Sequence, residues 1–319
     1  MSAIHTTQLR RVFGKLIAVD ALDLDVAEGE IFGLVGPDGA GKTTTMRMLT
    51  GILPPSGGSA QVAGCDVVRD AEKLKTHLGY MSQRFGLYPD LTVIENIAFY
   101  ADIYGVRSRE RAARTEQLLG FSNLTPFKHR RAGALSGGMK QKLGLACALI
   151  HTPRVLFLDE PTNGVDPVSR RDFWRILYQL VREGVTLFVS TAYLDEAERC
   201  NRLALLHQGR LLGLGTPDEV KQLMPGTLLE VRTSEPRRTA LLLREKLPAV
   251  TVGLFGDRVH LATRDATAAE TQSRSLIAAA GFDLLSIRPI EPSLEDVFVS
   301  VVGPRSPSAE DPPGPLSTL

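Results

Sequence analysis

A glycine-rich loop between an apolar run and a helical stretch constrains this chain most strongly. The loop reads Gly-Pro-Asp-Gly-Ala-Gly-Lys-Thr at 36–43, directly after Ile-Phe-Gly-Leu-Val at 31–35. Glycines let successive backbone N–H groups converge on an anion, and a helix start adds the positive end of its dipole. The pattern therefore predicts a phosphate cradle, with the Lys42 ammonium on the β- and γ-phosphates of a nucleotide and the Thr43 hydroxyl on Mg²⁺.

A second apolar run, at 155–158, ends in two carboxylates, Asp159 and Glu160. Acidic strand ends are common and mean little alone. Beside a phosphate cradle, the same pattern predicts that Asp159 contacts Mg²⁺ and that Glu160 orients or deprotonates an attacking water.

Short apolar runs alternate with helical periodicity from residue 4 to about 220. Further strand candidates lie at 186–190 and 203–206, and apolar residues recur at helical spacing over 167–182. Short continuous runs fit strands that are buried on both faces of a largely parallel sheet. The sequence therefore predicts an α/β fold.

The texture changes after the turn at 223–227. The order becomes β-α-β-β-α-β, with a hairpin tip at Gly256-Asp257, and this order is typical of a small ferredoxin-like α+β unit. We predict a first domain at 4–224, an accessory domain at 225–303 and a disordered tail at 304–319, which is rich in Pro and Ser.

The stretch Leu-Ser-Gly-Gly-Met-Lys-Gln at 135–141 resembles the signature sequence of ATP-binding cassette (ABC) ATPases. From the residues alone, Ser136 can cap a helix whose first residues, Gly137 and Gly138, leave N–H groups bare. The resemblance covers about residues 4–220. It implies a P-loop NTPase fold with a mostly parallel core sheet, an antiparallel β subdomain and a helical subdomain at about 88–150.

Three further residues follow the order of the cassette. By resemblance, Gln83 ligates Mg²⁺ and links the core to the helical subdomain, and Phe13 stacks on adenine, unless it is an ordinary core residue. Asp166 matches a loop that touches the opposing subunit, and it also suits an N-cap before Pro167. The implied nucleotide-binding residues are Phe13, Gly36, Pro37, Asp38, Gly39, Ala40, Gly41, Lys42, Thr43, Thr44, Ser136, Gly137, Gly138, Asp159 and Asp166. The implied Mg²⁺ ligands are Thr43, Gln83 and Asp159, and the implied catalytic residues are Glu160, Lys42 and Gln83.

The resemblance also implies partners. In this family ATP lies between two cassettes arranged head to tail, so we expect a second cassette, as a homodimer or, favoured here, a heterodimer. The segment 85–96 resembles the stretch that receives the coupling helix of a permease, with core packing as the alternative. The end of the accessory unit, 291–298, is similar to that of drug and antibiotic exporters of the ABC-2 type, which implies an ABC-2-type permease.

Two positions depart from the family pattern. Asp38 stands where Asn is usual. Because an added anion near phosphates is costly, we expect the Asp38 carboxylate to point away from them. The alternative is that Asp38 is a conservative replacement within the loop. Ala192 stands where a switch histidine contacts the γ-phosphate. Losing a hydrogen bond to a charged group costs about 1.5–3 kcal/mol, or about ten- to a hundredfold in rate. Both departures resemble the first, degenerate cassette of tandem-cassette ABC-2 multidrug exporter ATPases.

The sequence therefore predicts a transport-coupled ATPase with ATP and Mg²⁺ as cofactors, slow at its own site, for efflux of drug-like or other hydrophobic substrates. The alternative is a nucleotide-dependent structural subunit of a heteromeric exporter, with hydrolysis at the partner's site. A net charge of +1 argues against nucleic acid and against a cassette of translation or DNA repair. We found no membrane-spanning run, and expect a cytoplasmic protein held peripherally on the inner face of the cell membrane. The three cysteines are expected to be reduced.

Overall fold

The computed structural model describes residues 2–83 and 86–302. The chain forms two compact units, residues 1–217 and 218–319, which we describe separately. The division falls at the start of α8 (Pro217–Lys221), slightly before the predicted boundary at 224–225. The predicted tail at 304–319 lies outside the described residues. Within the described ranges, no helix combines the length and the apolar character that crossing a membrane requires.

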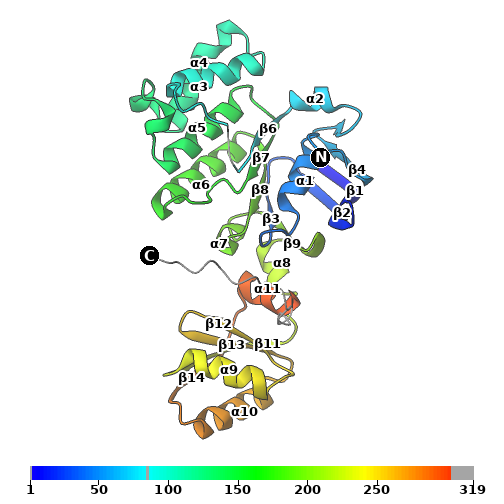
Figure 1. Cartoon of the computed structure of the whole chain (residues 1–319), viewed down its shortest axis with the longest axis vertical. Coiled ribbons are helices and arrows are strands. Elements are labelled where there is room, and N and C mark those ends of the chain that lie inside the picture. The colour runs from blue at the N-terminus through cyan, green and yellow to red at the C-terminus, as the bar shows by residue number, and fades with distance from the viewer. Residues whose placement is uncertain (1, 84–85, 303–319) are drawn as a thin grey trace, which may run out of the picture. The chain divides into compact units, whose positions relative to one another are not determined.

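A six-stranded sheet forms the centre of the first unit (Figure 1). Its strands, in order, are β10 (Arg210–Gly215), β9 (Arg202–His207), β3 (Ile31–Val35), β8 (Thr186–Thr191), β7 (Val155–Asp159) and β6 (Leu78–Met81). All pairs are parallel except β9 and β10. Every residue of β3, β7 and β8 is buried, because layers cover both faces of the sheet. The strands predicted from apolar runs are therefore confirmed.

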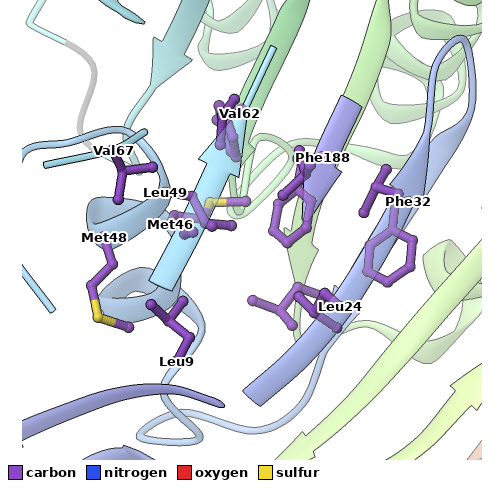
Figure 2. Packing of buried hydrophobic residues seen from close by; sticks show 14 of the residues in the cluster. Leu9, Leu24, Phe32, Met46, Met48, Leu49, Val62, Val67 and Phe188 are labelled. Carbon is purple, nitrogen blue, oxygen red and sulfur yellow. The ribbon is translucent and has the colours of Figure 1, made fainter. Parts of the chain in front are cut away.

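An antiparallel sheet and helix α1 (Lys42–Leu49) cover one face of the central sheet. The antiparallel sheet has the order β2 (Leu16–Ala27), β1 (Ser2–Phe13), β4 (Gly57–Val62) and β5 (Cys65–Asp66), and α2 (Ala71–Lys75) follows it. Figure 2 shows Leu9, Met46 and Val62 packed near Phe32 and Phe188. Those two rings stack at 5.4 Å between centroids, so the core is continuous from the antiparallel sheet to β3 and β8.

Helices cover the other face. Buried side chains of α5 (Gly137–Leu149) and α6 (Pro167–Arg182) pack against β3, β7 and β8, and α7 (Leu194–Ala197) follows β8. The helical subdomain adds α3 (Val93–Ile103), α4 (Ser108–Phe121) and two short 3₁₀ turns, η1 (Thr125–Phe127) and η2 (Ala132–Ala134). It has an apolar cluster of its own, into which α5 contributes Leu143 and Cys147. Helix α5 therefore joins the helical subdomain to the core.

The second unit has the predicted ferredoxin-like order. It consists of β11 (Thr227–Thr233), α9 (Pro236–Lys246), β12 (Thr251–Phe255), β13 (Arg258–Thr263), α10 (Ala266–Ala279), β14 (Leu284–Ile290) and α11 (Leu294–Val302). Its antiparallel sheet runs β12-β13-β11-β14, with α9 and α10 packed on an apolar cluster that includes Val231, Leu243 and Ile277. The sequence did not predict α11.

A buried carboxylate fixes the start of α11 to the sheet. Asp296 is 2 % exposed; its Oδ1 lies 2.7 Å from His260 Nδ1, and its Oδ2 accepts hydrogen bonds from the Ser293 backbone N–H at 3.0 Å and from the Ser293 hydroxyl at 2.6 Å. Burial raises the pKa of Asp296, but the hydrogen bonds from His260 and Ser293 outweigh it, so the pKa lies below its usual range. The ionised form therefore stabilises the fold.

Replacing Asp296 with alanine is expected to lower the free energy of unfolding at pH 7 by about 1–3 kcal/mol, because buried donors lose their acceptor. A lowered pKa gives stability that is present above the unfolded pKa of about 3.9 and is lost as the pH falls through the native pKa. The difference between parent and variant should therefore narrow below about pH 4. Guanidinium unfolding of the full chain at several pH values measures this. The neighbouring exposed Glu295→Ala is the control, and an equal loss in both variants would contradict the anchoring role of Asp296.

Candidate active site

The carboxyl ends of four neighbouring strands meet at one edge of the central sheet. Strand β3 leads into the loop at 36–41, β7 ends at Asp159, β8 ends at Thr191, and β6 leads to Gln83. Parallel register places Asp159 beside Ser190. Ligands of open α/β sheets bind at such an edge, so the topology gathers residues that are far apart in sequence.

Two glycines hold the loop against the sheet. A Cβ at Gly36 would lie 2.2 Å from the Leu206 carbonyl oxygen, and a Cβ at Gly41 would lie 2.4 Å from that of Ala18. Gly41 also has φ +104°, which L side chains rarely adopt. Helix α1 begins immediately afterwards, at Lys42. The loop therefore packs so closely against the backbone at Leu206 and Ala18 that neither glycine position has room for a side chain.

Lys42 is a buried cation at the centre of the site. Its ammonium donates to the carbonyl oxygens of Gly36 at 2.7 Å and Pro37 at 3.0 Å, and lies 3.1 Å from Glu160 Oε1. The side chains of Lys42 and Glu160 are 4 % and 11 % exposed. A buried charge must be compensated, and the carboxylate of Glu160 supplies that compensation here.

Asp159 lies behind this ion pair and is 1 % exposed. Its Oδ1 accepts hydrogen bonds from the hydroxyls of Ser190 at 2.6 Å and Thr43 at 3.2 Å, and its Oδ2 accepts one from the Tyr80 hydroxyl at 3.4 Å. Burial, together with the nearby negative charge of Asp159, raises the pKa of Tyr80 to about 12, so its hydroxyl stays a donor. The structure thus brings the predicted pair Thr43 and Asp159 together.

Glu160 is the hub of the site. Its Oε2 accepts hydrogen bonds from Gln83 Nε2 at 2.9 Å and Asn163 Nδ2 at 3.3 Å, and its backbone N–H donates to the Ser190 hydroxyl at 3.0 Å. Its backbone has φ +48°, which is unfavourable for a residue with a Cβ. Such strain persists where surrounding contacts over-determine the conformation, often at functional sites.

A hollow of about 620 Å³ opens over the cradle. Asp38, Gly39, Ala40, Gly41, Lys42, Thr43, Thr44, Gln83, Glu160 and Phe13 line it, and all were predicted. Phe13 is 44 % exposed and carries the Arg11 guanidinium over its ring at 4.6 Å, so it is not a core residue. Asp38 is also exposed.

Leu16, Ile17, Ala18 and Gln208 line the same hollow and were not predicted. Leu16 and Ile17 lie just beyond the tight turn after Phe13, and they are exposed apolar residues of a strand. Their closeness to Phe13 in sequence was the available signal. Gln208 comes from the β9–β10 turn, which carries no motif.

The signature residues lie elsewhere. Ser136 caps α5 and accepts a hydrogen bond from the Met139 backbone N–H at 3.3 Å. A Cβ at Gly137 would have room, whereas one at Gly138 would lie 2.5 Å from Ser169 of α6. Gly138 is therefore required for contact between α5 and α6. None of Ser136, Gly137 and Gly138 is among the described residues that line the hollow.

Asp166 caps α6, as its position before Pro167 suggested. Its Oδ1 accepts hydrogen bonds from the backbone N–H groups of Ser169 at 2.9 Å and Val168 at 3.1 Å. The Ser169 backbone hydrogen bond is the main reason that the pKa of Asp166 lies below its usual range. Asp166, like the signature, does not line the hollow in the part of the chain that is described.

The switch position follows β8. Ala192 is exposed and has no side-chain donor, and Tyr193 follows it. Sequence reasoning did not assign Tyr80, Asn163, Ser190 or Tyr193 to the site, because their contacts arise only when β6, β7 and β8 lie side by side (Figure 1).

Comparison with known proteins identifies the family. The chain is 34% identical over 97% of its length to "Daunorubicin resistance ATP-binding protein DrrA2" of Streptomyces coeruleorubidus, of which it covers 97%. The chain belongs to the ABC transporter ATP-binding proteins. The ABC transporter family profile matches residues 19–163 of this ABC ATPase. The structure titled "Structure of ATP binding subunit of ABC transporter" matches 69% of the chain with a TM-score of 0.63 and 27% identity, and 92% of that protein is covered.

A relative of greater length is also similar. The ABC ATPase is 46% identical over 90% of its length to "Probable multidrug ABC transporter ATP-binding protein YbhF" of Escherichia coli. This match covers 49% of that protein, and the same holds for the protein of that name from Shigella flexneri. The chain thus spans about half the length of these relatives.

The residues that line this site fit a nucleoside triphosphate. The glycine-rich loop packs too closely on neighbouring backbone for side chains at Gly36 and Gly41, and a buried ammonium lies against it. The hydroxyl of Thr43 and the carboxylate of Asp159 supply oxygen ligands beside it. Within residues 2–83 and 86–302, no three His, Cys, Asp or Glu side chains form a metal cluster. Oxygen ligands such as the Thr43 hydroxyl and the Asp159 carboxylate are those that Mg²⁺ takes when it is bound together with phosphates.

Proposed function

We propose that this chain is an ATP-binding and ATP-hydrolysing subunit of an ABC-2-type exporter, coupling cassette dimerisation to efflux through a separate permease. The observation that carries the proposal is the convergence of Lys42, Glu160 and Gln83 on one hollow. Relatives named for multidrug transport and for daunorubicin resistance support drug-like or other hydrophobic substrates. The proposed place is the cytoplasmic face of the cell membrane, where such a subunit meets its permease.

The contacts described above support the following proposed roles. Lys42 exchanges Glu160 and loop carbonyls for the β- and γ-phosphates, and backbone N–H groups between Asp38 and Thr44 hold the remaining oxygens. Phe13 offers its exposed face to adenine. Thr43, Gln83 and Asp159 would hold Mg²⁺, which neutralises phosphate charge. Released from Lys42, Glu160 orients or deprotonates the attacking water.

A second cassette is part of the proposal. Ser136 and Asp166 cap the N-termini of α5 and α6, outside the hollow, and both residues are exposed. Such exposed helix N-termini suit contact with a nucleotide held by another cassette. We favour a heterodimer because Ala192 leaves this site without the switch-residue donor to the γ-phosphate.

A hollow of about 310 Å³ is the proposed seat of the permease. Gln83, Leu87, Pro89, Gly133 and Lys140 are among the residues that line it. Gln83 belongs to both this hollow and the nucleotide hollow, so movement at one can reach the other. In the segment 85–96, Tyr88 is 46 % exposed, Leu87 is partly buried, and Phe85 lies outside the described residues.

The isolated chain is expected to turn over ATP slowly, below about 1 per second. Mixing it with a cassette that has the switch histidine should raise turnover, because this chain's signature completes the second site. Ser136→Arg in this chain should abolish the increase. Steady-state phosphate release from each chain and from the mixture measures the effect.

The matched control is Ser108→Arg, an exposed serine at the start of α4, which should leave the increase intact. Turnover by the isolated chain above about 10 per second would contradict pairing with a more active cassette.

A structural subunit, whose bound ATP only holds the dimer together, is the second candidate. Ala192 favours it, since the switch position offers no donor to the γ-phosphate. Glu160 with its supporting contacts argues against it, because a site used only for binding needs no held carboxylate.

A further inference from the structure

Asn163 and Tyr193 form a chain of hydrogen bonds that ends on Glu160. Asn163 Nδ2 lies 3.3 Å from Glu160 Oε2, and the Tyr193 hydroxyl donates to Asn163 Oδ1 at 3.4 Å. Asn163 comes from the loop after β7, whereas Tyr193 comes from the turn after β8. Tyr193, which follows the switch position, is therefore linked to the Glu160 carboxylate through Asn163. This link is separate from the contacts of Glu160 with Lys42 and Gln83.

A buried glutamate fixes the two loops relative to each other. Glu196 is fully buried and accepts hydrogen bonds from the hydroxyls of Thr162 at 2.5 Å and Thr191 at 2.9 Å. Arg170 of α6 lies 3.5 Å from the same carboxylate, which compensates its charge. Thr162 immediately precedes Asn163, so this carboxylate ties the loop after β7 to the end of β8.

The ring of Tyr193 is held in the same frame. The Arg170 guanidinium lies over the ring at 4.5 Å from its centroid, and the Tyr193 backbone N–H donates to the Thr191 hydroxyl at 2.9 Å. Guanidinium contact with an aromatic face favours one orientation of the ring. The hydroxyl is thereby directed at Asn163 although the ring is 38 % exposed.

We propose that Tyr193 is a positioning residue for hydrolysis at this site, and that its hydroxyl, acting through Asn163, fixes the carboxylate of Glu160 towards the attacking water. The inference rests on the proposed function, since it requires turnover at the site. It gives the chain a means of orienting Glu160 when the adjacent Ala192 provides no donor. Glu160 changes partners when Lys42 turns to phosphate, and Asn163 then keeps one of its oxygens in place.

Lengths of 3.3–3.4 Å are long for such bonds. Hydrogen bonds at catalytic groups are often long without substrate and tighten in the substrate complex. The contribution should therefore appear in kcat rather than in the affinity for ATP, because ATP does not need the Tyr193 hydroxyl to bind.

The test is Tyr193→Phe in the full chain, which removes only the hydroxyl and keeps the ring beneath Arg170. We expect kcat for ATP to fall about three- to tenfold, with KM and nucleotide affinity unchanged within about twofold. Asn163→Ala should reproduce this split. In a Glu160→Gln background, Tyr193→Phe should have no further effect, because the group that it positions is gone. Tyr178→Phe is the matched control, with the same 38 % exposure and a hydroxyl directed at the Arg199 carbonyl.

Two results would overturn the inference while leaving the proposed function intact. The first is a parental kcat in Tyr193→Phe when Glu160→Gln still abolishes turnover. The second is a raised KM with unchanged kcat, which would place the hydroxyl on the nucleotide. If Glu160→Gln itself leaves turnover unchanged, the proposed function fails instead.

Discussion

Replacing Glu160 with glutamine is expected to lower ATP turnover by about a hundredfold or more. The amide cannot accept a proton from water, and it also loses the ion pair with the Lys42 ammonium at 3.1 Å. Lys42 is then freer to meet phosphate, so affinity for ATP should be kept or increased. Single-turnover hydrolysis and binding of a fluorescent ATP analogue measure the two effects separately.

The same variant separates the two candidate functions. In membranes that contain the permease and the second cassette, transport should fall if this site drives export, and should persist if ATP here only holds the dimer. Glu116→Gln is a suitable control, because Glu116 is 57 % exposed and pairs only with Lys128 at 3.5 Å among the described contacts. Equal turnover in the Glu160 and Glu116 variants would show that Glu160 is not the base.

Most of the core sheet was predictable because its strands are short, continuous and apolar. The strands predicted at 31–35, 155–158 and 186–190 match β3, β7 and β8 to within a residue, since burial on both faces demands an unbroken apolar run. The ferredoxin-like order was predictable from the alternation of elements. Helix α11 was missed, although its start has a capping box made by Ser293 and Asp296.

The site was predictable where chemistry lies in a contiguous motif. Lys42, Thr43 and Glu160 follow from the loop and the strand end, and the structure places them together. Contacts between strands were not predictable in the same way. The pairing of Asn163 with Tyr193 depends on the adjacency of β7 and β8, which no local pattern specifies.

Gly138 shows a different limit. In sequence, two consecutive glycines after Ser136 suggest bare N–H groups for a phosphate. In the structure, α6 also approaches Gly138 so closely that a Cβ on this residue would lie 2.5 Å from Ser169. A close contact between helices and an anion-binding site can therefore each require glycine. Only the tertiary structure distinguishes the two reasons.

Introducing the missing histidine, Ala192→His, is expected to raise turnover of the isolated chain about ten- to a hundredfold. Ala192 is exposed at the end of β8, next to the strand that carries Asp159, so an imidazole there extends from the sheet edge that holds Lys42 and Glu160. A donor to the charged γ-phosphate adds stabilisation that alanine cannot give. Phosphate release by the isolated chain, with binding of a fluorescent ATP analogue alongside, measures the gain.

The control is Ala113→His, which adds an imidazole at an exposed position of α4 and should change nothing. If Ala192→His binds ATP as the parent does but turns it over no faster, the missing donor is not what makes the site slow. If Ala192→His raises turnover and adding Tyr193→Phe lowers it by the same factor as in the parent, the two residues act on different groups. The histidine then acts on phosphate and the tyrosine on Glu160. Independent effects multiply in rate because their free energies add. That outcome would show that the hydrogen bonds from Tyr193 through Asn163 act in addition to a restored switch histidine and do not substitute for it.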